Sequence, residues 1–299
     1  MMATRESHYA RGVVFMLLAG TVAAINSPLF REVQEAGQWD VIATRNGTMF
    51  LTLFALLAWR SRGRVVTAFR AAGRPALAAG LILGLGNTTF ALSVIHTTVA
   101  NSLFILSASP FVAAGFAWLL LRERVPMATI WFIAAALLGV GIMVYEGLGA
   151  GRLFGNLMAV LTMLCHAGFV VSLRVGRAAD MLPAVVMAGF TGTVIAMAAG
   201  AAPWTMTGYD LAVCVVMGAF AMSIGFVFFT MGSRHVPAAQ VALLSLTEVV
   251  FGPVMVLLTH REVPSALTLV GGAIVLTAVI AQALWGMRTG APSGGQAKA

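Results

Sequence analysis

The stretch Leu121-Arg-Glu-Arg-Val-Pro126 ends one long apolar run of this chain, and His260-Arg-Glu-Val-Pro264 ends another. The two Arg-Glu pairs lie 139 positions apart. The same shift superposes further pairs of residues, namely Gly86 and Gly225, Phe90 and Phe229, His96 and His235, Ala100 and Ala239, and Asn101 and Gln240. Matches that stay in register over about forty residues and end in the same turn motif indicate an internal repeat.

The sequence around these motifs consists of continuous apolar runs. The chain is 60% hydrophobic and 9% charged, whereas a soluble domain is roughly 45–50% apolar and 25% charged. Each run approaches the ~20 residues that a helix needs to cross a membrane, and barrel strands would be shorter and alternating. We place ten spans at Gly12–Leu29, Asp40–Trp59, Pro75–Ile95, Thr98–Leu121, Pro126–Glu146, Phe154–Leu173, Pro183–Ala202, Tyr209–Gly232, Val236–Thr259 and Pro264–Trp285.

The repeat divides these spans into two units of five, at residues 1–147 and 148–289, followed by a polar tail at 290–299 that we expect to be disordered. Because five is an odd number, the second unit enters the membrane from the opposite side. The expected fold is therefore an all-α integral membrane protein of ten transmembrane helices in two inverted repeats. Secondary transporters often have this architecture, in which two halves rock around a central site.

The basic residues predict the orientation. With the N-terminus inside, fourteen of the eighteen Lys and Arg residues fall on the inner side, and the others are Arg31, Arg45, Arg152 and Arg261. This asymmetry predicts cytoplasmic N- and C-termini and a multi-pass protein of the inner (plasma) membrane. It also accounts for the net charge of +8 without a nucleic-acid partner.

Glu248 is the acidic residue that lies deep inside an apolar run. An unpaired charge at the centre of a bilayer costs roughly 2.5–3.5 kcal/mol on insertion scales, so this side chain should face the protein interior or water. Helical spacing places Gln240 and Leu244 in one row with Glu248, and Ser245 and Gly252 lie alongside this row. Glu248 is thus a candidate contact for a substrate amino group or a proton, and a structural hydrogen-bonding acid is the alternative.

Further polar and aromatic residues inside the runs are candidates for substrate binding. His166 offers a hydrogen bond or a proton, Phe169 a stacking face, and Asn26, Asn87 and Asn101 both donors and acceptors, as a zwitterionic substrate needs. Each polar residue also suits hydrogen bonding between helices.

Two prolines, Pro110 and Pro253, interrupt the fourth and ninth spans. A proline inside a helix frees a carbonyl group and bends the helix. We expect each to be either a hinge near the site or a static bend.

These motifs allow a resemblance to be named. Two five-span halves, each with a fourth helix that ends in an Arg-Glu turn before proline, resemble the drug/metabolite transporter superfamily of the EamA type. The chain departs from the Leu-Glu-Pro pattern frequent in that family, because Ser109 precedes Pro110 and Val249 follows Glu248. Within the superfamily the chain is similar to the YddG-type aromatic amino-acid exporters. The resemblance implies alternating-access export of amino acids, aromatic or neutral.

Other classes were weighed against this interpretation. The sequence has no catalytic or phosphate-loop motif, so we expect neither an enzyme nor an ATP-driven pump, and no cofactor or metal. A drug or organic-cation exporter and a passive channel stay open. A sugar-phosphate antiporter would need Lys or Arg in its core, which is absent unless Arg45 reaches inward. The expected partners are a small-molecule substrate and membrane lipid, and a monomer is compatible with the sequence.

Overall fold

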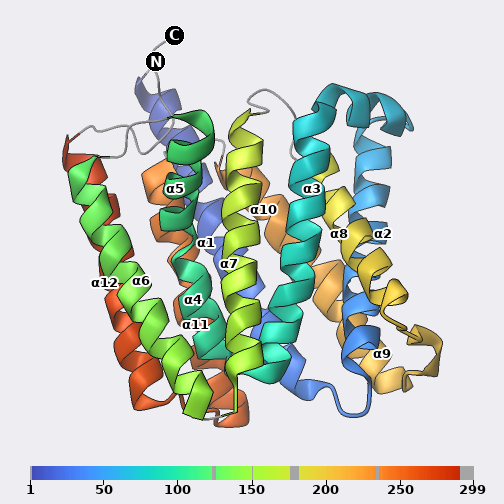
Figure 1. The fold of residues 1–299 in the computed structure, drawn as a ribbon. Helices are drawn as coiled ribbons and strands as arrows, with labels where there is room; N and C mark the ends of the chain where they lie inside the picture. Colours follow the sequence, from blue (N-terminus) through green and yellow to red (C-terminus); the bar gives the residue numbers. More distant parts are fainter. Residues whose placement is uncertain are drawn as a thin grey trace.

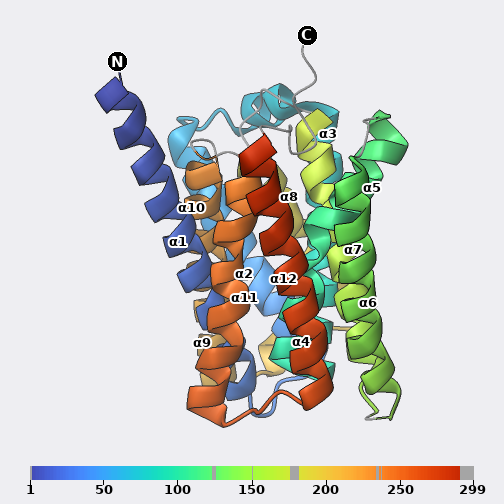
Figure 2. The same cartoon turned by 90° about the vertical axis from the view of Figure 1, so that its left-hand side faces the viewer.

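The computed structural model describes residues 2–122, 126–149, 151–175, 182–233, 236 and 238–289. Within these ranges every regular element is a helix, and the helices pack side by side into one bundle (Figures 1 and 2). In chain order they are α1 (Met2–Glu32), α2 (Gln38–Arg60), α3 (Val65–His96), α4 (Val99–Ser107), α5 (Ser109–Leu121), α6 (Met127–Gly149), α7 (Leu153–Val175), α8 (Leu182–Ala198), η1 (Pro203–Thr205), α9 (Gly208–Val215), η2 (Val216–Met222), α10 (Ser223–Ser233), α11 (Ala238–His260) and α12 (Ala266–Thr289).

Eight helical stretches of the described chain are long and apolar enough to cross a membrane. The two shorter apolar helices are α8 and the Leu244–His260 part of α11. Every expected span overlaps one helix or a set of consecutive helices. Large apolar side chains such as Trp131 and Leu258 lie exposed on the outside of the bundle, as lipid-facing positions require. The chain is therefore a multi-pass helical membrane protein.

The two ends of the bundle are distinguished by the chain termini. α1 begins and α12 ends at the same end, which we call the terminal end, while α1 and α11 finish at the opposite end, the far end (Figures 1 and 2). The main hydrophobic core joins α3, α4, α6, α7 and α12, and a second core joins α2, α3 and α8.

The third span is preceded by a short helical segment that lies across the terminal end in Figure 1. Gly73 has φ +71° and separates this segment from the spanning part of α3. Pro75 follows two residues later and suits the first turn of the second segment, where its missing N–H is not needed. The expected span began at this proline, and the break confirms that boundary.

The fourth expected span is two helices. α4 ends at Ser107, and α5 begins at Ser109 with Pro110 in its first turn, so the backbone breaks at Ala108. Pro253, by contrast, lies inside the continuous helix α11. The two prolines thus interrupt their spans differently, the first at a helix boundary and the second within a helix.

The eighth expected span contains a turn of π-helix, η2, between α9 and α10. Gly218 in this turn packs directly on α2, where an added Cβ would collide with the carbonyl oxygen of Arg45 and with Thr48 Oγ1. The Ser223 hydroxyl donates to the Gly218 carbonyl oxygen at 2.8 Å and occupies one acceptor of the widened turn. The absence of a side chain at Gly218 is what allows the two backbones to meet.

The repeated motif adopts the same backbone conformation at both of its copies. Arg122 follows α5 with φ 53°, and Arg261 follows α11 with φ 54°. Residues with a Cβ rarely adopt this left-handed conformation. Its occurrence at the two arginines that the repeat aligns shows that the motif ends both helices in the same way.

Helices α6 and α12 cross at a pair of glycines. A Cβ on Gly139 would lie 2.6 Å from the carbonyl oxygen of Gly271, and a Cβ on Gly271 would lie 2.7 Å from that of Gly139. The contact is reciprocal and joins backbone to backbone, as small residues allow between membrane helices.

Candidate functional site

Glu248 lies on the middle of α11, where this helix packs against α1. A Cβ on Gly20 of α1 would lie 3.2 Å from the backbone nitrogen of Glu248, so Gly20 and Glu248 lie at the same level along the bundle. The side chain is half-buried, and no hydrogen bond or ion pair joins it to another described residue. Ser245, one turn before, is also half-buried and donates to the Val241 carbonyl oxygen of its own helix at 2.9 Å. The side chain of Gln240 lies outside the described residues.

His166 lies on the middle of α7, beside the break between α4 and α5. Its Nδ1 is 3.1 Å from the Ser109 hydroxyl, and its ring centroid is 6.2 Å from that of Phe169. Phe169 is almost fully buried, and Ser109 directly precedes Pro110. The structure therefore places the predicted residues His166, Phe169 and Pro110 at one junction of α5 and α7.

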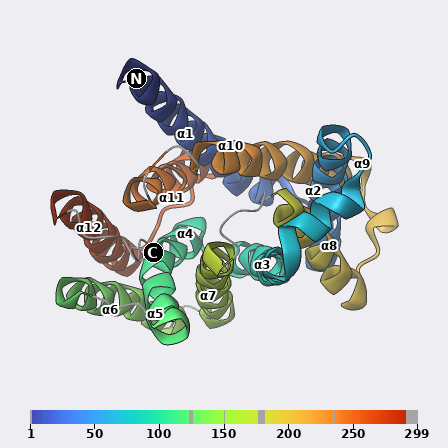
Figure 3. The same ribbon diagram turned by 90° about the horizontal axis from the view of Figure 1, so that it is seen from above.

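Glu248 of α11 and His166 of α7 lie on opposite sides of α4. Seen from the terminal end in Figure 3, α4 lies between α11 and α7, and it packs against both. No hydrogen bond links the two side chains. A substrate that contacts both would have to bridge this separation.

A buried arginine, Arg45 of α2, was not predicted as a site residue. It is 1% exposed, its Nη2 donates to the Asn87 carbonyl oxygen of α3 at 2.9 Å, and its guanidinium carbon lies 5.1 Å from the centre of the Phe30 ring. Phe30 in turn meets Phe90 edge to face at 6.3 Å. The signal in the sequence was a single arginine a few residues inside an apolar run, and the interior position could not be known before the packing of α1 and α3 on α2.

Two of the predicted asparagines accompany Arg45. Asn26 precedes Phe30 by one turn of α1, and Asn87 precedes Phe90 by almost one turn of α3, so each shares a helix face with the aromatic residue next to Arg45. Both are 8% exposed. Asn26 Oδ1, Asn87 Nδ2 and Arg45 Nε are buried atoms without a hydrogen-bond partner among the described residues.

Asn101 lies in a separate network at the far end. Its Nδ2 donates to Asn156 Oδ1 at 2.8 Å, and its Oδ1 accepts from Thr268 Oγ1 at 3.0 Å. Asn156 Oδ1 also accepts from Thr97 Oγ1 at 2.8 Å, and Asn156 Nδ2 donates to the Met143 carbonyl oxygen at 2.9 Å. The polar atoms of the Asn101 side chain are thus occupied, and Asn156 is a buried partner that the sequence analysis did not single out.

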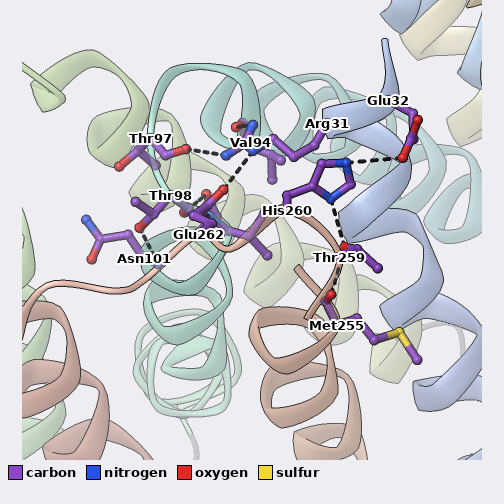
Figure 4. Close-up of polar contacts among 12 residues, drawn as sticks. Arg31, Glu32, Val94, Thr97, Thr98, Asn101, Met255, Thr259, His260 and Glu262 are labelled. Carbon is purple, nitrogen blue, oxygen red and sulfur yellow. Dashed lines mark hydrogen bonds and ion pairs between the residues drawn. The ribbon is translucent and has the colours of Figure 1, made fainter. Parts of the chain in front are cut away.

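A second set of polar contacts holds the far end together (Figure 4). Arg31 Nε contacts Glu262 Oε2 at 2.7 Å, and the other two nitrogens of Arg31 donate to the carbonyl oxygens of Val94 and Thr97 at 2.7 and 3.0 Å. Glu262 Oε1 accepts from the backbone N–H of Val99 at 2.8 Å. We call Arg31 and Glu262 the clasp, because they join the end of α1, the turn between α3 and α4, and the loop after α11.

A histidine contact lies beside the clasp. His260 Nε2 is 3.2 Å from Glu32 Oε1, and His260 Nδ1 is 2.8 Å from Thr259 Oγ1 (Figure 4). Both the clasp and this contact link α1 to α11 or its following loop, so polar side chains join these two elements at the far end. Among the described residues, no group of three His, Cys, Asp or Glu residues could hold a metal ion.

Comparison with known proteins agrees with this architecture. The chain is 25% identical to the pseudopaline exporter CntI of Pseudomonas aeruginosa over 281 residues, which cover 90% of this chain and 95% of the exporter. It is 24% identical to solute carrier family 35 member G1 of Homo sapiens, over 89% of this chain and 77% of that protein. It is 26% identical to the uncharacterized transporter YdeK of Bacillus subtilis, over 69% of this chain and 74% of that one.

The fold also matches a solved structure and a family model. A protein of known crystal structure superposes with a TM-score of 0.61 at 16% identity, over 95% of this chain and 99% of the other. The model of the EamA-like transporter family matches residues 10–145 and again residues 153–282. These two matches cover most of the chain, and the protein belongs to the EamA-like transporter family.

Proposed function

We propose that this protein is a secondary transporter that exports small metabolites, with aromatic or neutral amino acids as the favoured class. Membership of a transporter family and similarity to a named exporter support the transport role. The observation that carries the substrate proposal is Glu248, a half-buried carboxylate at mid-bundle without a partner among the described residues.

Glu248 is suited to a positively charged group. A carboxylate inside a membrane protein is costly unless a partner neutralises it, and the ammonium group of an amino acid would supply both charge and hydrogen bonds. The same reasoning favours an organic cation, which is the second candidate. A passive channel is the third, and it differs by showing no saturation.

The proposed architecture is ten spans in two inverted repeats, residues 1–147 and 148–289. Its support is the double match to one family model and the shared left-handed conformation of Arg122 and Arg261. We place the terminal end in the cytoplasm and the protein in the inner membrane, because the basic residues gather at that end. The protein is proposed to act as a monomer, without cofactor or nucleic acid.

Alternating access would then use the features described above. We propose that the clasp holds the far end closed, so that the pathway opens toward the terminal end. Pro110 at the break between α4 and α5 is the proposed hinge beside His166 and Phe169, and Pro253 is a second bend within α11. Asn101 would support the site through its network at the far end.

The test is flux into liposomes that hold the purified protein. Labelled amino acids, organic cations and sugar phosphates are offered with and without a pH gradient to wild type and Glu248→Gln. Glu35→Gln removes an equal charge from an exposed position and is the matched control. Saturable amino-acid flux that is lost in Glu248→Gln and kept in the control supports the proposal.

Other outcomes reject parts of it. Undiminished amino-acid flux in Glu248→Gln makes this residue structural. Saturable flux of organic cations alone selects the second candidate, and flux that rises linearly with concentration selects the channel.

A further inference from the structure

The surroundings of Arg45 contain charge and hydrogen-bonding capacity that the protein itself does not use. The guanidinium group is always protonated and carries five N–H donors, yet one hydrogen bond to the Asn87 carbonyl oxygen is its polar contact among the described residues. Within the described part of the chain, Arg45 Nε and Asn87 Nδ2 are buried donors without acceptors, and Asn26 Oδ1 is a buried acceptor without a donor. Such groups are rare in native proteins and call for an explanation.

No described carboxylate neutralises Arg45. Asp210 of α9 is fully buried at the far end, but its carboxylate accepts hydrogen bonds from the backbone N–H groups of Gln34, Glu35 and Ala36 at 2.9 to 3.0 Å. It is thereby committed to the loop between α1 and α2. A buried cation left without an anion is strongly unfavourable, and the contact with the Phe30 ring offsets only part of this cost.

A pocket at the far end is lined in part by Phe30, the residue whose ring contacts Arg45. It has a volume of about 210 Å³, Arg31 and Ile95 are among its lining residues, and Phe30 and Val41 also line it. Val41 precedes Arg45 by one turn of α2, and the Phe30 ring lies against the guanidinium group. The Phe30 ring thus separates the pocket from the unused donors.

The position of Arg45 along the bundle differs from that of Glu248. Gly20 marks the depth of Glu248 on α1, and Asn26 lies six residues further along this helix, which is about 9 Å nearer the far end. The Arg45 region therefore lies on the far-end side of Glu248.

We propose that Arg45 and Asn87 form a subsite for the carboxylate of the transported molecule, whose ammonium group contacts Glu248. This inference rests on the proposed function and narrows it to amino acids with a free carboxylate, as opposed to organic cations. One guanidinium and one neutral amide match the single negative charge of a carboxylate, with one donor for each oxygen. A phosphate monoester carries more charge than this pair neutralises. Movement of the Phe30 ring would connect the subsite with the pocket.

The test is the thermal unfolding of the purified full-length protein with four ligands that share a phenyl group. They are phenylalanine, phenylalanine amide, 3-phenylpropionate and phenyl phosphate. A ligand that binds only the folded state stabilises it by RT ln(1 + [L]/Kd), so the dependence of the unfolding temperature on ligand concentration gives the affinity. The wild type is expected to bind phenylalanine at least tenfold more tightly than the amide, because a charge-assisted hydrogen bond is worth roughly tenfold or more in affinity.

Two variants separate the two parts of the site. Arg45→Gln should lose at least tenfold in affinity for phenylalanine and 3-phenylpropionate and leave the amide unchanged, and Arg45→Lys should recover part of the loss. Glu248→Gln should weaken phenylalanine and the amide and leave 3-phenylpropionate unchanged. Failure of the Glu248 pattern alone rejects the proposed amino-group contact and leaves the carboxylate subsite intact.

Several results would overturn the subsite. They are equal wild-type affinity for phenylalanine and its amide, a folded Arg45→Gln that keeps full affinity for the acids, or no binding of any carboxylate. The comparison of acid and amide needs the wild type alone, so it decides the matter even where Arg45→Gln does not fold. Tighter binding of phenyl phosphate than of 3-phenylpropionate would overturn the assignment to a carboxylate.

Discussion

The clasp makes a quantitative prediction about which conformation the protein populates. Glu262→Gln keeps the size of the side chain and one acceptor for the Val99 N–H, but it removes the charge that faces Arg31. The side chains of Arg31 and Glu262 are 23% and 19% exposed. Their interaction should therefore lie between the 0.2–1 kcal/mol of a surface ion pair and the 1.5–3 kcal/mol of a buried charged hydrogen bond. Loss of an interaction of about 1–2 kcal/mol lowers the ratio of molecules with a closed far end to molecules with an open far end by about 5–30-fold.

Spin labels on either side of the clasp would measure this shift. The labels are attached to cysteines that replace the exposed residues Gln34 and Val263, in a variant that lacks the two native cysteines. Pulsed electron–electron double resonance in lipid nanodiscs then gives the distribution of distances between the two labels. Glu262→Gln should enlarge the population at longer distance, and Glu35→Gln, which removes a charge outside the clasp, should not. An unchanged distribution in Glu262→Gln would show that the clasp does not hold the far end closed.

Three further predictions concern packing, hydrogen bonding and topology. Gly218→Ala forces a Cβ against the backbone of α2 and should lower the free energy of unfolding by about 1–3 kcal/mol, measured by thermal unfolding. The control Gly115→Ala, which adds its Cβ to open space, should leave this free energy unchanged or raise it by up to about 1 kcal/mol. Equal effects of the two variants would contradict the close contact between Gly218 and α2. Asn156→Ala leaves two buried donors without their acceptor and should cost about 2–4 kcal/mol; a loss below 1 kcal/mol would mean that water replaces the amide. Single cysteines at Arg64 and Val263 should react with an impermeant thiol reagent from opposite faces of the membrane, the first from the cytoplasm; labelling from one face would refute the proposed orientation.

The spans were predictable because hydropathy reports a local property. Every apolar run overlaps helix in the structure, and the boundary at Pro75 was placed correctly because proline suits a helix start. The break at Ala108 lies beside Pro110, where the sequence predicts an interruption of the fourth span, but the π-helical turn at Val216–Met222 was not predicted. This turn accompanies the contact of Gly218 with α2, and such contacts leave no periodic signal along the chain.

The site was predictable only as a set of residue types. Sequence reasoning selected Asn26 and Asn87 as polar residues in apolar runs, and it left open whether their neighbour Arg45 reaches inward. The contacts of Arg45 with Phe30 of α1 and Asn87 of α3 depend on how the helices pack, which a single sequence does not specify. In the same way, nothing local distinguishes Asn101, whose side-chain amide is fully hydrogen-bonded, from Asn87, whose amide nitrogen has no acceptor among the residues that the structure describes.

The crossing of α6 and α12 has a consequence for any rocking motion. Gly139 and Gly271 press backbone against backbone, each toward the carbonyl oxygen of the other, so no side chain lies between them that could change rotamer. Contacts of this kind gain from close Cα–H···O approach and lose it when the helices slide. We therefore expect the contact between α6 and α12 to act as a pivot, about which the two helices rotate through small angles while their point of contact stays fixed. The large displacements during transport should occur in helices far from this pair.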